Sequence, residues 1–149
     1  MLSVFLKCRD TLFLMATIKS WFNGYTPAII WWLIVLGLMC TPGKDFPDLG
    51  SWTEQIKLDK IIHIGIFSLM GYMFMRPVSK TDLPTAIKNN YFLKIAIAIS
   101  LWGITTEFIQ HFWIPGRSFD LWDWVADTIG AFAAYFYARK YLLKENLSK

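Results

Sequence analysis

The chain has 149 residues, of which 55% are hydrophobic, 17% aromatic and 17% charged, with a formal net charge of +4. A soluble domain of this size could not bury so much apolar surface, so a lipid bilayer is the better solvent. The sequence carries no glycine-rich phosphate loop, nucleophile elbow or nucleic-acid motif, and we expect no nucleic-acid partner.

The first part of the chain, residues 1–24, is predicted to be an N-terminal extension. Its apolar stretch from Leu12 to Ile18 is too short to cross a bilayer, and no small-residue cleavage site follows, which argues against a signal peptide. Two interpretations stay open. Either the extension is an interfacial helix, or translation starts at Met15 and residues 1–14 are absent from the mature protein.

Four apolar runs follow that are long enough to cross a bilayer, which takes about 20 mostly apolar residues, with about 17 sufficient. The runs cover residues 25–41, 60–77, 91–113 and 120–141. Cys8 and Cys40 lie near opposite ends of the first run, too far apart for a disulfide. The sequence therefore predicts an all-α polytopic membrane protein: a four-helix domain over residues 25–141 and a cytoplasmic tail over residues 142–149.

Basic residues are unevenly divided between the two ends of these runs. Because loops rich in Lys and Arg stay in the cytoplasm, we expect both termini inside and the loops at 41–59 and 114–119 outside. The predicted inner side carries Lys7, Arg9, Lys19, Arg76, Lys80, Lys88, Lys94, Arg139, Lys140, Lys144 and Lys149.

Acidic residues gather on or just below the predicted outer face. Glu107 lies about 9 Å below Trp113, and Asp127 about 10 Å below Asp120, so the two acids are expected at similar depth. An ionised carboxylate facing lipid would cost about 2.5–3.5 kcal/mol, so these acids should face the bundle interior. Helical spacing supports this, because three sets of polar residues each share one helix face. The sets are Asp59 with His63, Glu107 with Gln110 and His111, and Asp120 with Asp123 and Asp127.

Structural roles account for some of these residues. Asp120 fits a helix N-cap, and Asp123, three residues later, can complete a capping box. Arg117 follows a Pro-Gly turn and can fold over the acids as a counter-ion. His63 can be an ordinary interior histidine, and His111 an exposed polar residue. Gln110 can form a hydrogen bond to a neighbouring helix. Asp127 lies beyond the first turn, where capping does not explain it.

Two segments together resemble the VanZ-like family of small bacterial membrane proteins. They are LDKIIHIGIFSLMGYMF at 58–74 and TEFIQHFWIPGRSFDLWDWVADTIGA at 106–131, and the resemblance covers residues 25–140. One position departs from the family pattern, because Asp127 stands where the family often has Asn. The resemblance implies a four-helix protein of the bacterial cytoplasmic membrane, and the named family member is associated with low-level resistance to the lipoglycopeptide teicoplanin.

Three classes of function stay open. The favoured one is an outward-facing polar pocket that binds a lipid-linked cell-wall component or a lipoglycopeptide, alongside membrane lipids. The second is an integral-membrane enzyme acting on an envelope lipid, with Glu107 or His63 as acid–base and Arg117 stabilising negative charge. The third is a proton-coupled carrier or a structural membrane subunit. The predicted ligand-binding residues are Asp59, Lys60, His63, Glu107, Gln110, Arg117, Asp120, Asp123 and Asp127.

No cofactor is expected. His63, Glu107, His111 and Asp123 are suitable metal-ligand types, but they lack a tight metal spacing such as H-E-x-x-H, so no metal site is predicted from the sequence. The acids outnumber the basic residues near them, Lys60 and Arg117. We therefore expect either a proton on Glu107 or Asp127, or a cation or cationic ligand group in the site.

Overall fold

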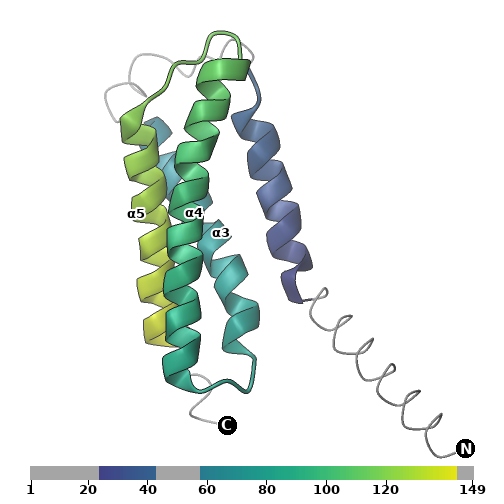
Figure 1. The fold of residues 1–149 in the computed structure, drawn as a ribbon, viewed down its shortest axis with the longest axis vertical. Helices are drawn as coiled ribbons and strands as arrows, with labels where there is room; N and C mark the ends of the chain where they lie inside the picture. The colour runs from purple at the N-terminus through teal and green to yellow at the C-terminus, as the bar shows by residue number, and fades with distance from the viewer. Residues whose placement is uncertain (1–23, 43–57, 144–149) are drawn as a thin grey trace, which may run out of the picture.

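The structure, a computed structural model, describes residues 24–42 and 58–143, and every regular element in these ranges is helical (Figure 1). The elements are a helix at Gly24–Met39, α3 (Leu58–Ser79), α4 (Thr85–Trp113), α5 (Leu121–Tyr137) and a π-helical turn, η2 (Ala138–Leu142). The predicted all-α class is confirmed. The interpretations of residues 1–14 and of Cys8 lie outside the described residues.

Helix α4 begins at Thr85, six residues before the apolar run that starts at residue 91. The extra residues, TAIKNN, are mostly polar, but their backbone is already helical, since Lys88 N donates to Pro84 O at 3.0 Å. The Lys88 side chain turns back and donates from Nζ to Ser79 O at 2.9 Å, which satisfies a carbonyl at the end of α3. Hydropathy marks where a helix becomes apolar, whereas hydrogen bonding marks where it begins.

Helices α3, α4 and α5 lie side by side as a bundle, and α5 packs most extensively against α3 (Figure 1). Gly130 allows this approach, because a Cβ atom there would lie 2.5 Å from the backbone oxygen of Ile64. A hydrogen bond also joins the two helices at this point, from Ser68 Oγ to Gly130 O at 3.0 Å. Small residues that bring two backbones together are typical of helix contacts in membranes.

The Gly24–Met39 helix packs against the bundle near α3 and α4. Trp31 Nε1 donates to Ile66 O at 3.2 Å, and Gln110 Nε2 donates to Met39 O at 3.1 Å. Between these bonds, Val35 is fully buried in the same apolar cluster as Phe67. The Gly24–Met39 helix is thus held by α3 in its middle and by α4 at its C-terminal end.

The outer surface of the bundle is strongly apolar. Among the described residues, α3 and α4 are long and apolar enough to cross a membrane, while the apolar Gly24–Met39 helix is shorter. Large apolar side chains face outward, including Leu101 and Phe136, each 60% exposed. Water-facing helices rarely carry so many of them, whereas lipid-facing helices normally do.

Candidate functional site

Charged side chains meet at the end of the bundle where α3 and α5 begin and α4 ends, which is the upper end in Figure 1. We call these residues the outer cluster. It comprises Asp59, Lys60 and His63 from α3, Glu107 from α4, and Asp120, Asp123 and Asp127 from the start of α5.

Lys60 is the cation at the centre of the ion pairs. Its Nζ lies 2.7 Å from Asp120 Oδ2 and 3.3 Å from Asp59 Oδ2, and it also pairs with Asp123 Oδ1. The side chains of Lys60 and Asp123 are 24% and 10% exposed, so this pair is screened from water more than a surface pair would be. Lys60 therefore joins α3 to the first turn of α5.

His63 and Asp127 form a buried pair below Lys60. His63 Nδ1 lies 2.8 Å from Asp127 Oδ1, and the two side chains are 4% and 0% exposed. On the other side of the ring, Nε2 lies 3.8 Å from Asp59 Oδ1, one helical turn earlier. The predicted shared face of Asp59 and His63 is thus present, and Asp127 is held by a specific partner.

Gly103 makes the space that the Asp127 carboxylate occupies. A Cβ atom on Gly103 would lie 2.8 Å from Asp127 Oδ2, closer than real side-chain contacts allow. Gly103 was not among the predicted site residues. Its position four residues before Glu107, on the same helix face, is the sequence signal that could have identified it.

Glu107 is fully buried, and its Oε2 accepts a hydrogen bond of 3.0 Å from the backbone nitrogen of Asp120. The prediction that Glu107 and Asp127 meet at one depth is wrong, because Glu107 contacts the start of α5 while Asp127 packs against Gly103, one turn deeper. The cause is the 114–120 segment, which brings the chain back along α4 before α5 begins.

The N-cap prediction for Asp120 is confirmed, since its Oδ1 accepts from Trp122 N at 2.8 Å. The capping-box prediction for Asp123 is wrong. In a capping box the side chain at Asp123 would bond the Asp120 backbone nitrogen, but that nitrogen donates to Glu107 and the Asp123 carboxylate pairs with Lys60.

Two buried carboxylate oxygens accept no hydrogen bond from any residue that the structure describes. They are Glu107 Oε1 and Asp127 Oδ2. A buried polar atom without a partner is costly, and in native proteins such atoms often mark a place for a ligand, ion, proton or water. The outer cluster thus has acceptor capacity that its own described side chains do not fill.

The other predicted residues lie around the outer cluster. Gln110 is buried and bonds the first helix through Met39 O, as a structural role would require. His111 is exposed and lies edge-on to Phe112, with ring centroids 4.8 Å apart. Arg117 is half-buried just beyond Gly116, whose φ of 78° forms the turn of the short loop. The assignment of Arg117 as counter-ion to the acids stays a prediction.

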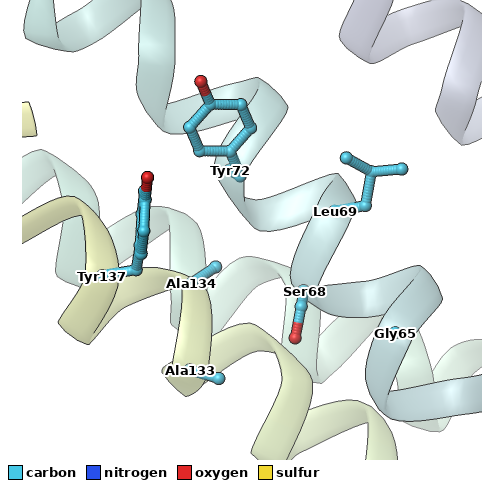
Figure 2. Close-up of a pocket in the computed structure, with 7 residues that line it drawn as sticks. All are labelled: Gly65, Ser68, Leu69, Tyr72, Ala133, Ala134 and Tyr137. Carbon is cyan, nitrogen blue, oxygen red and sulfur yellow. The ribbon is translucent and has the colours of Figure 1, made fainter.

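An apolar groove lies elsewhere, between α3 and α5, with a volume of about 510 Å³ (Figure 2). Figure 2 shows small residues along it, Gly65, Ser68, Ala133 and Ala134, and the rings of Tyr72 and Tyr137. Its lining is Gly65, Ser68, Leu69, Tyr72, Ala133, Ala134 and Tyr137. This groove is separate from the outer cluster and shares none of its residues.

Over residues 24–42 and 58–143, these features define an all-helical protein with two membrane-capable helices and a partly buried charged cluster at one end. The chain belongs to the VanZ/LLP1 family, whose model matches residues 8–144. The resemblance seen in the sequence is thus confirmed, over a longer stretch than residues 25–140. Comparisons with curated proteins and with solved structures return no match.

Proposed function

We propose that this VanZ/LLP1 protein uses the outer cluster to bind the polar head of a cell-envelope ligand, either lipid-linked or a lipoglycopeptide. The observation that carries the proposal is the buried, unfilled carboxylate oxygen Oε1 of Glu107. Structural acids are normally satisfied by their neighbours, whereas a binding site keeps acceptors for its ligand. Through this binding the protein would contribute to teicoplanin resistance.

The chemistry of the outer cluster restricts the ligand. Ionised carboxylates only accept hydrogen bonds, so the matching ligand group is a donor such as a sugar hydroxyl or an ammonium group. Glycans and lipoglycopeptides carry such donors. Exposed aromatic side chains at the same end, Trp113 at 71% and Trp122 at 70%, suit the apolar faces of a glycan or the start of a lipid chain.

A second candidate is an integral-membrane enzyme that modifies an envelope lipid. It is supported by the His63–Asp127 pair, because a buried carboxylate bonded to Nδ1 orients the ring and prepares Nε2 as a general base. Binding remains the favoured function, because the outer cluster contains no serine, cysteine or threonine placed as an activated nucleophile against His63 among the described residues.

Mass spectrometry of co-purified molecules tests the proposal. Wild-type protein extracted from bacterial membranes should retain a ligand with a donor-bearing head, and Arg117→Ala should retain at least about tenfold less, as expected when a charged contact at a binding site is lost. Arg76→Ala is the matched control, because Arg76 is an exposed arginine at the far end of α3. Identical lipids on all three proteins would contradict the proposed site.

The proposed topology has four membrane crossings, with both termini and the 80–84 turn in the cytoplasm and the outer cluster outside. The described basic residues Arg76, Lys80 and Lys88 lie at the end opposite the outer cluster, as positive-inside orientation requires. Ser118→Cys should therefore react with a membrane-impermeant thiol reagent in intact cells, and Thr81→Cys should not. These experiments need a background without native cysteines. Labelling of Thr81→Cys before lysis would overturn the orientation.

A further inference from the structure

We propose that the outer cluster binds one divalent transition-metal ion, such as Zn²⁺ or Mn²⁺, through Asp59, His63 and Asp123. One ligand atom from each of these residues lies within 4.8 Å of the other two. This set differs from the one considered in the sequence, because His111 is exposed while Asp59, one turn before His63, faces the ring. The inference concerns a metal site and does not depend on the proposed ligand.

His63 is held as metal-binding histidines usually are. Such histidines typically donate one ring N–H to a carboxylate, which fixes the ring and leaves the other nitrogen for the metal. His63 Nδ1 lies 2.8 Å from the buried Asp127 carboxylate, so a proton on Nδ1 leaves the lone pair on Nε2. That nitrogen faces Asp59 Oδ1 at 3.8 Å, beyond hydrogen-bond range. In this tautomer two electron-pair donors face each other, an arrangement that a metal ion between them would stabilise.

The charge of the outer cluster gives a second, independent reason. Asp59, Asp120 and Asp123 share Lys60 as an ion-pair partner, and Asp59 also faces His63. Behind them lie the buried carboxylates of Glu107 and Asp127, each with an oxygen that accepts no hydrogen bond within the described chain. Uncompensated buried carboxylates are costly, and a divalent ion would add positive charge beside them.

The ligand set indicates the class of metal. One imidazole nitrogen and two carboxylate oxygens suit Zn²⁺ or Mn²⁺, and three protein ligands leave a coordination position open. Bonds to Zn²⁺ are about 2.0–2.2 Å long, so the ligand atoms must close to within about 4 Å of one another. Asp59 has room to make this adjustment, because its side chain is 61% exposed at the start of α3. Each carboxylate has two oxygens, so Lys60 and the ion can share them.

Manganese binding tests the site on full-length protein purified in detergent and stripped with EDTA. Bound Mn²⁺ loses its sharp six-line electron paramagnetic resonance signal, so a titration gives stoichiometry and affinity. Wild-type protein should bind one Mn²⁺ per chain, and Zn²⁺ should displace it. His63→Gln and Asp123→Asn should each bind at least about tenfold more weakly.

Matched variants separate a metal site from a general attraction to acids. His111→Gln changes the other histidine of the chain, which is exposed, and should bind Mn²⁺ like wild type. Lys60→Met should bind at least as tightly as wild type, because it removes the positive charge that competes for Asp59 and Asp123. Asp59→Asn changes an exposed side chain, so it should fold normally and still weaken binding.

The absence of Mn²⁺ binding by folded wild-type protein would overturn the inference. The positive charge between His63 and Asp59 would then come from a second proton on the His63 ring and not from a metal ion. Equal binding by wild type, His63→Gln and Asp59→Asn would overturn it too. Metal binding is read from the Mn²⁺ signal alone, so its failure is distinct from a failure of the co-purified ligand test.

Discussion

Gly130→Ala should destabilise the protein more than the same change at any other described glycine. The new Cβ would lie 2.5 Å from Ile64 O and 3.1 Å from Phe67 Cβ, and the nearer atom belongs to the α3 backbone, which cannot move aside alone. Overpacking of this kind costs about 1–3 kcal/mol of unfolding free energy. The midpoint of heat-induced loss of the monodisperse peak in detergent should therefore fall by several degrees.

Gly65→Ala is the matched control for this prediction. Gly65 is also in the α3–α5 region, but a Cβ atom there meets nothing within 4 Å. Alanine has a higher helix propensity than glycine, so this variant should be as stable as wild type or more stable. If Gly130→Ala and Gly65→Ala lose the monodisperse peak at the same midpoint temperature, α3 and α5 are further apart than the structure places them.

Glu107→Ala should abolish teicoplanin resistance conferred by the protein, at equal expression in the membrane. The change removes the acceptor for the Asp120 backbone nitrogen and one of the two buried unfilled oxygens. Both the start of α5 and the proposed ligand contact are then lost. The measurement is the minimal inhibitory concentration of teicoplanin in a sensitive strain, with protein quantified by immunoblot.

Asp127→Asn should be mild in the same assay. An asparagine oxygen can still accept from His63 Nδ1, and the change removes one charge from a cluster that has an excess of acids. Asp82→Asn, an exposed acid in the turn after α3, is the control and should match wild type. If Glu107→Ala also matches wild type, the acids of the outer cluster serve helix packing and the proposed binding site is wrong.

The helices were predictable because each needs a long apolar run, and runs of that length are few in this chain. Their ends were less predictable, as at Thr85–Asn90, where a mostly polar segment begins the helix before the apolar run. Length and hydropathy also leave the number of membrane crossings undecided. Helices α3 and α4 are long and apolar enough to cross a membrane, whereas the Gly24–Met39 helix is apolar but shorter.

Within the site, contacts inside one helix followed from spacing, and contacts between helices did not. Asp59 and His63 are one turn apart, so their proximity is a property of any helix. The His63–Asp127 pair and the Glu107 bond to Asp120 depend on how far α5 is displaced along α4, which the short loop determines. The space beside Asp127 exists because Gly103 has no side chain. A search of the sequence for charged and polar residues does not single out a glycine.

The helices differ considerably in length, with consequences for the surrounding lipid. Helix α4 has 29 residues, about 44 Å at 1.5 Å per residue, whereas the Gly24–Met39 helix is about 24 Å long. In the proposed topology both cross one bilayer, whose hydrocarbon core is about 30 Å thick. The first helix is fastened to α4 through Gln110 and Met39, so it cannot slide to relieve this hydrophobic mismatch. Thinning of the membrane along that side of the protein would relieve the mismatch, and it would favour short or disordered acyl chains there.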